Sequence, residues 1–221
     1  MKRSQINGII RQAEAFFAEY HVHLPPFGMF SPAQIRALGE DWRELRDNML
    51  GWDITDFGSG DYARVGLLMF TLRNGNYKDP SGKPYAEKLL LADENQHTPM
   101  HFHHKKMEDI IVRAGGNLIV KVYNATQTDA LAETDVAIMM DGRRYAVPAG
   151  TEVRLTPGES ITLPQRQYHE FWGEPGHGRV LIGEVSRVND DKSDNRFLNP
   201  VGRFAAIEED EAPLRLLCNE Y

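Results

Sequence analysis

Residues 97–116 have the sequence HTPMHFHHKKMEDIIVRAGG, and two of their histidines are spaced for a metal site. His101 and His103 are two residues apart, so in an extended strand both side chains face the same way. Glu108 follows five residues later and has the wrong parity for an unbroken strand. A turn or bulge before Glu108 is therefore required to bring all three side chains into one cavity.

Residues 158–173, GESITLPQRQYHEFWG, supply a further imidazole at His169. Three imidazoles and one carboxylate suit a borderline divalent ion such as Mn²⁺, Fe²⁺, Co²⁺, Ni²⁺ or Zn²⁺. His104 has the opposite parity to its neighbouring histidines, which places it outside the site. The predicted metal ligands are His101, His103, Glu108 and His169.

Short β-type segments separated by turns surround both stretches, and this pattern is typical of an antiparallel sandwich or barrel. Asp141-Gly142 predicts one hairpin, and Gly115-Gly116 predicts another. A barrel of about eight strands can enclose one small ligand. The expected strands are 63–73, 85–92, 110–112, 118–123, 136–140, 143–147, 153–155, 160–163, 169–172 and 179–188.

The segments on either side of this region have a different character. Apolar residues at helical spacing predict an amphipathic helix over 4–20, with Ser4 as its cap. Ser31-Pro32-Ala33-Gln34 begins a second helix, which we expect to continue to about Met49 with a break near Gly39. Residues 51–62 are expected to form a loop. We therefore expect a single domain with a helical extension at 1–62, a mainly β barrel at 63–188 and a wrapping segment at 189–221.

Composition limits the partners and the compartment. The 221 residues carry a net charge of −7, which favours neither nucleic acid nor an anionic membrane surface as a partner. Cys218 is the single cysteine, so no intrachain disulfide can form, as expected in a reducing compartment. No long apolar run suggests a signal peptide or a spanning helix. We expect a cytoplasmic protein.

Both stretches resemble the paired motifs of the cupin family, Gly-x5-His-x-His-x(3,4)-Glu-x6-Gly and Gly-x5-Pro-x-Gly-x2-His-x3-Asn. The four predicted ligands fall on the ligand positions, and Gly115, Gly158 and Pro164 are also in register. The departures are Asn95, Arg166 and Gly173, all at turn positions. This resemblance implies a jelly-roll β-barrel.

A narrower resemblance extends over most of residues 50–205. The runs YAEKLLLADENQHTPMHFHHKKMEDII and GEVSRVNDDKSDNRF, together with the chain length, are similar to the D-lyxose isomerases. The resemblance implies a metal-dependent aldose–ketose isomerase that interconverts D-lyxose and D-xylulose, and D-mannose and D-fructose, through an enediol. It also implies Mn²⁺ as cofactor and a homodimer. Co²⁺, Fe²⁺, Ni²⁺ and Zn²⁺ are alternatives. The sequence has no glycine-rich phosphate loop, which favours a free sugar over a phosphosugar as substrate.

Two charged residues are candidates for the proton transfer. The resemblance places Lys106, in KMED, in the active site, although a solvated turn lysine like its neighbour Lys105 is the alternative. Glu184 shares strand parity with apolar Val180 and Ile182, and a buried carboxylate is costly without a partner. The candidate sugar-binding residues are Lys88, Gln96, Thr98, Phe171, Asp190 and Arg196.

Two other functions use the same fold. An Fe(II)-dependent dioxygenase can use the same ligand set, but charged Lys88, Lys106 and Glu184 favour sugar hydroxyls over an aromatic substrate. A non-enzymatic sugar-binding cupin can dispense with metal ligands, and this chain keeps all four.

Overall fold

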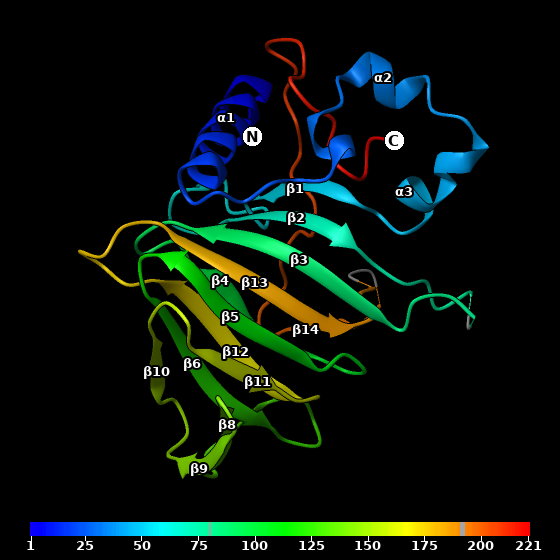
Figure 1. Ribbon diagram of the computed structural model, residues 1–221. Helices are drawn as coiled ribbons and strands as arrows, with labels where there is room; N and C mark the ends of the chain where they lie inside the picture. The colour runs from blue at the N-terminus through cyan, green and yellow to red at the C-terminus, as the bar shows by residue number, and fades with distance from the viewer. Residues whose placement is uncertain (80, 191–192) are drawn as a thin grey trace.

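The computed structural model describes residues 1–79, 81–190 and 193–221, and it consists mainly of two curled antiparallel sheets (Figure 1). An eight-stranded sheet has the order β1-β2-β3-β13-β5-β11-β8-β9. A six-stranded sheet has the order β10-β6-β12-β4-β14, with β7 paired to β6. The expected mainly β fold is confirmed.

The strands are β1 (Gly51–Thr55), β2 (Leu67–Arg73), β3 (Tyr85–Ala92), β4 (Thr98–His103), β5 (Glu108–Gly115), β6 (Leu118–Ala125), β7 (Leu131–Ala132), β8 (Val136–Met140), β9 (Arg143–Val147), β10 (Glu152–Leu155), β11 (Ser160–Leu163), β12 (Gln167–Gly173), β13 (Val180–Arg187) and β14 (Asn195–Phe197). The helices are α1 (Arg3–Glu19), α2 (Pro32–Arg36) and α3 (Arg43–Asp47), with the 3₁₀ turns η1 (Pro26–Met29) and η2 (Glu40–Trp42).

The main core lies between the two sheets and is built by strand alternation. Ile110 and Val112 of β5 face Val120 and Val122 of β6 within one buried apolar cluster. Because successive side chains of a strand point to opposite faces, every second residue of these strands enters the core. A charged residue at the same parity must then also point inward.

A second core lies under α1, on the outer face of the eight-stranded sheet. Ile6, Ile10 and Phe17 of α1 are buried in one cluster with Trp52 and Phe70. Figure 1 shows α1, α2 and α3 on the same side of the molecule as β1, with both chain termini near them. The amphipathic helix predicted near the N-terminus is confirmed.

The C-terminal segment packs against the start of α1. The guanidinium of Arg3 is buried and contacts both Glu209 and Glu220. The hydroxyl of Ser4 donates to Asp210 at 2.6 Å, and the helix is capped at Lys2, so the prediction of Ser4 as the cap is wrong. No helix in the described part of the chain is long and apolar enough to cross a membrane.

Two local predictions also differ from the structure. Residues 51–55 form β1, which pairs with β2, rather than part of a loop. Gly115-Gly116 is not a hairpin turn, because the strands on either side of it belong to different sheets. A Cβ on Gly116 would lie 2.3 Å from the Gly178 carbonyl oxygen, so the glycine permits close packing where the chain crosses between sheets.

Other turn predictions are confirmed. Asp141-Gly142 joins β8 and β9, which pair from Val136↔Val147 to Met140↔Arg143. Ser31 forms the expected capping box with Gln34. The helix that begins there ends at Arg36 and is followed by η2 and α3, so the expected break near Gly39 is confirmed. The division at residues 62 and 188 remains a prediction.

Candidate metal centre

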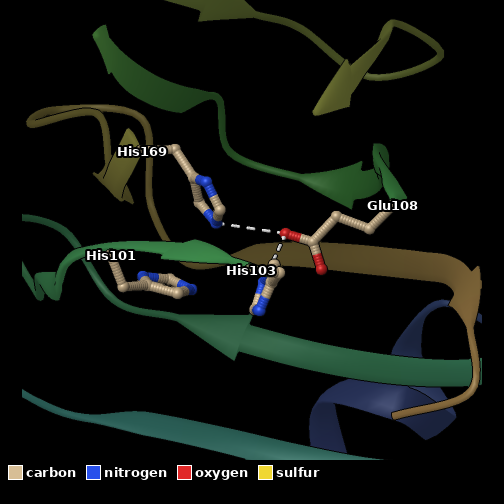
Figure 2. A group of neighbouring side chains, drawn as sticks. All are labelled: His101, His103, Glu108 and His169. Carbon is tan, nitrogen blue, oxygen red and sulfur yellow. Dashed lines mark hydrogen bonds and ion pairs between the residues drawn. The ribbon is translucent and has the colours of Figure 1, made fainter. Parts of the chain in front are cut away.

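Three histidines project from adjacent strands of the six-stranded sheet into the space between the sheets (Figure 2). His101 and His103 lie on β4, and His169 on β12 is the register partner of His101. The ring centroids of His101 and His169 are 4.1 Å apart. All three side chains are buried.

Glu108 reaches the same point from the opposite sheet. The chain turns after β4, and Glu108 is the first residue of β5. Its Oε1 lies 3.3 Å from Nε2 of His103 and 3.1 Å from Nε2 of His169 (Figure 2). The four potential ligand atoms all lie within 4.8 Å of one another. The change of sheet is what resolves the parity mismatch between His103 and Glu108.

The other ring nitrogen of each histidine is engaged with an oxygen acceptor. Nδ1 of His101 and Nδ1 of His169 each donate to the backbone carbonyl two residues earlier, at 2.8 and 3.1 Å. Nδ1 of His103 donates to Oδ1 of Asn195 at 2.8 Å. A neutral imidazole has one N–H, so each Nε2 carries a lone pair directed toward the cluster. This is the arrangement that a metal-binding histidine requires.

Protonation favours the same arrangement. Burial lowers the pKa of His101 well below its usual range, and the nearby His169 and His103 add to this effect. Burial and the Lys106 ammonium lower the pKa of His103. Burial alone would raise the pKa of Glu108, but Lys106 and His103 hold it well below its usual range. Neutral imidazoles and an ionised carboxylate are the ligating forms, so the residues fit a divalent cation.

A buried charged cluster adjoins the four ligands. Nζ of Lys106 lies 2.7 Å from Oε2 of Glu108 and 3.0 Å from Oε1 of Glu184. Nζ of Lys88 lies 3.2 Å from the same Glu184 oxygen. Asn189 accepts from both ammonium groups through its Oδ1, at 2.8 Å for Lys88 and 3.2 Å for Lys106. Within this cluster of described residues, the two lysines and the two glutamates balance in charge.

Strand register explains this cluster. Glu184 of β13 pairs with Lys88 of β3 on one side and with Ile110 of β5 on the other. Glu184 is two residues after Ile182, so its side chain also points into the core. The inward-facing side chains of β13 are therefore apolar up to Ile182 and are followed by a carboxylate. Burial opposes ionisation of Glu184, but Lys106 and Lys88 hold its pKa below the usual range.

The cavity at the metal centre is small and is lined by several of the predicted residues. Its volume is about 40 Å³. Thr98 and Phe171 line it together with His101, Lys106 and Glu184. The Thr98 hydroxyl is buried and has no hydrogen-bond partner among the described residues, so it is available to a bound molecule.

Three predicted sugar-binding residues are not among the described residues that line this cavity. Gln96 donates to the Tyr62 carbonyl and accepts from the Asp93 N–H, which ties two loops together. Asp190 lines a neighbouring outer pocket of about 450 Å³. Arg196 is exposed and donates to the Phe197 carbonyl. His104 is exposed, as its parity predicted.

Sequence reasoning missed several residues at the site. Asn195 and Phe197 alternate with Arg196 on β14, so they face the cavity while Arg196 faces away. Parity would have found them if the strand had been recognised. Arg203 lines both the cavity and the outer pocket, and its guanidinium contacts Asp53. No local pattern indicates Arg203.

Comparison with known proteins identifies the family. The sequence model of the D-lyxose isomerase family matches residues 1–221. A D-lyxose/D-mannose isomerase of Serratia proteamaculans is 56% identical over 226 residues, covering 100% of this chain and 98% of the relative. A protein of the same name from Escherichia coli is 52% identical over 223 residues, with 100% and 98% coverage.

Solved structures show the fold. An L-ribose isomerase of Cellulomonas parahominis superposes with a TM-score of 0.65 at 17% identity, covering 94% of this chain and 98% of that one. This likeness confirms the expected cupin-type barrel. With the family match over its full length, the chain belongs to the D-lyxose isomerase family and is an aldose–ketose isomerase.

Proposed function

We propose that this chain is a metal-dependent isomerase of free sugars that interconverts D-lyxose with D-xylulose and D-mannose with D-fructose. The names of its relatives support these substrates. The observation that carries the proposal is the buried cluster of three histidines and Glu108 beside the Lys106–Glu184 pair. Neither of the alternative functions is favoured by any feature of this site.

His101, His103, Glu108 and His169 would hold the ion, and we propose Mn²⁺, with Co²⁺, Fe²⁺, Ni²⁺ and Zn²⁺ as alternatives. Three imidazoles and one carboxylate are a donor set that fits each of these ions. A bound ion would polarise a sugar oxygen and stabilise negative charge that develops on it.

Glu184 and Lys106 are proposed to move the protons. Glu184 is ionised, because the lysines hold its pKa low, so its carboxylate can accept the C2 proton of the aldose and return it to C1 of the enediol. Lys106 offers its N–H groups to the sugar oxygens, supplying a proton to O1 and recovering one from the O2 hydroxyl. The two groups are 3.0 Å apart, so one enediol can contact both.

The remaining polar residues are proposed to hold the sugar. Lys88 and Thr98 point into the cavity and can bind hydroxyl groups, while the ring of Phe171 supplies an apolar surface. Asp190 would contact a sugar from the outer pocket. Gln96 and Arg196 would not contact the sugar directly and would affect its binding only through the segments to which they are hydrogen-bonded. A homodimer and a cytoplasmic location are further proposals, and light scattering tests the first.

The decisive experiment is isomerase activity on a panel of free aldoses. The purified protein is stripped with EDTA, assayed, and assayed again with each of the five metal ions restored. We expect D-lyxose activity to vanish on stripping and to return most fully with Mn²⁺. Full activity in metal-free protein, or inactivity on all the aldoses with every ion, would reject the proposal.

A further inference from the structure

Asn189 bridges the two lysines of the charged cluster. Its Oδ1 lies between the ammonium groups of Lys88 and Lys106, which also share Oε1 of Glu184. The four side chains therefore form a closed ring in which cations and acceptors alternate. Lys106 meets three oxygen acceptors in this arrangement, since it also contacts Glu108. An ammonium group has three N–H donors, so these contacts orient the Lys106 ammonium.

A second asparagine fixes Asn189 from outside the ring. The side chain of Asn74 donates through Nδ2 to the Asn189 carbonyl at 3.0 Å. Its Oδ1 accepts from the Asn189 N–H at 2.9 Å. One amide thus satisfies both backbone groups of a residue that is 115 positions away in the sequence. Asn74 is itself buried and also donates to the Asn48 carbonyl at 3.2 Å.

We propose that Asn189 and Asn74 are positioning residues for the isomerisation. Asn189 holds the two ammonium groups on either side of Glu184, and Asn74 holds Asn189 in place. Among the described residues, the hydrogen bonds of Asn189 and Asn74 run to each other, to the two lysines and to Asn48, and to none of the four candidate metal ligands. Both residues therefore act on the proton-transfer groups and leave metal binding alone. The inference rests on the proposed function, because it assigns these residues to the reaction of Lys106 and Glu184.

The neutral amide at position 189 fits this role. Lys88, Lys106, Glu108 and Glu184 already balance as two positive and two negative charges. An amide oxygen can orient both lysines without adding a third buried anion, whose desolvation would be costly. A carboxylate at position 189 would bind the lysines more tightly and compete with Glu184 for them.

The test compares kcat, KM and bound metal in the Mn²⁺-loaded enzyme and its variants, with D-lyxose as substrate. In Asn189→Ala we expect kcat to fall by about tenfold or more, because loosened catalytic groups lose rate rapidly with misplacement. Bound metal should stay at the wild-type level, and KM should change much less than kcat. Asn74→Ala should lower kcat in the same way but by a smaller factor.

The double variant shows whether Asn74 acts on kcat through Asn189 or whether the two residues act on kcat independently. If Asn74 acts through Asn189, the Asn74→Ala/Asn189→Ala enzyme should be no slower than Asn189→Ala alone. Asn76→Ala is the matched control, because Asn76 lies in the same segment and bonds to Asn48 rather than to Asn189. Asn74→Asp keeps the acceptor for the Asn189 N–H, so it should recover part of the kcat lost in Asn74→Ala.

The outcomes also separate this inference from the proposed function. An active wild-type enzyme whose kcat is unchanged in Asn189→Ala would overturn the inference alone. Losses that multiply in the double variant, or a loss confined to bound metal, would overturn it as well. If Asn189→Ala does not fold, the comparison of kcat between Asn74→Ala and Asn74→Asp tests the inference instead. A kcat that Asn74→Asp does not recover would overturn it. A wild-type enzyme that isomerises no aldose with any ion would reject the proposed function and this inference with it.

Discussion

Nε2 of His169 lies 3.1 Å from Oε1 of Glu108, and no hydrogen bond joins the two atoms. The imidazole N–H is on Nδ1, where it donates to a backbone carbonyl, so a nitrogen lone pair faces a carboxylate oxygen. In a buried site this contact is repulsive, and a cation between the two atoms would make it attractive. The candidate metal centre is therefore expected to be strained when no cation is bound.

This contact predicts that metal stabilises the fold and that His169→Ala removes the effect. A ligand present at one hundred times its Kd adds about 2.7 kcal/mol to the free energy of unfolding. We expect the melting temperature of the EDTA-treated protein to rise when Mn²⁺ is added. His169→Ala should show no such rise and should retain no metal after gel filtration. His177→Ala, which removes an exposed histidine, should behave like wild type.

Lys106 and Lys105 provide a matched pair for testing catalysis. Lys106 is buried against two carboxylates, whereas Lys105 is exposed and lies over the ring of Tyr77. Lys106→Ala should keep its metal and lower kcat by about a hundredfold or more, the range expected for an acid–base group. It should also unfold more easily, because two buried carboxylates lose a partner. Lys105→Ala should have nearly wild-type kcat. Equal kcat values for the two variants would show that Lys106 has no part in catalysis.

Proton transfer by Glu184 predicts exchange with solvent. In heavy water, D-xylulose formed from D-lyxose should carry deuterium at C1, because the base exchanges its proton before returning it. Glu184→Gln keeps the shape of the side chain but removes the base, so we expect it to bind metal and turn over at least about a hundredfold more slowly. Product without any deuterium would instead indicate a hydride shift between the two carbons or a base that is fully shielded from solvent.

Local sequence patterns predicted the four residues of the candidate metal centre, and strand parity indicated Glu184 beside it, whereas Lys106 was indicated by the family resemblance. The spacing of His101 and His103 and the inward parity of Glu184 depend only on neighbours in the chain. Even the departures from the motif preserve local geometry. Asn95 and Arg166 stand where the family motif has glycine, and both adopt the positive φ that glycine favours, 56° and 61°.

Long-range contacts account for the residues that sequence analysis missed. Asn189 reaches the lysines because Asn74 holds its backbone, and nothing near Asn189 in the chain indicates this. Arg203 comes to the cavity through its contact with Asp53, which is 150 residues away. The hairpin expected at Gly115-Gly116 was wrong for a related reason. A glycine turn between two strands does not show whether they pair or enter different sheets.

Burial of the ligand histidines predicts how the stability of the metal-free protein depends on pH. Burial lowers the pKa of both His101 and His103 in the folded state below the usual 6.5. As the pH falls through 6.5, the unfolded chain therefore binds protons that the folded protein does not, and stability decreases. Each imidazole contributes a decrease of up to about 1.4 kcal/mol per pH unit.

Urea unfolding of the EDTA-treated protein at pH 7.5 and pH 5.5 measures this decrease. We expect a lower midpoint at pH 5.5 in wild type and a smaller change in His101→Gln/His103→Gln, which lacks both titrating groups. The carboxylates do not produce the same effect, because the lowered pKa of Glu184 matters only near and below its unfolded value, close to 4.5. Equal stability at the two pH values would mean that the imidazoles take up protons in the folded metal-free protein as readily as in the unfolded chain. The histidines would then have to release these protons before a cation could bind.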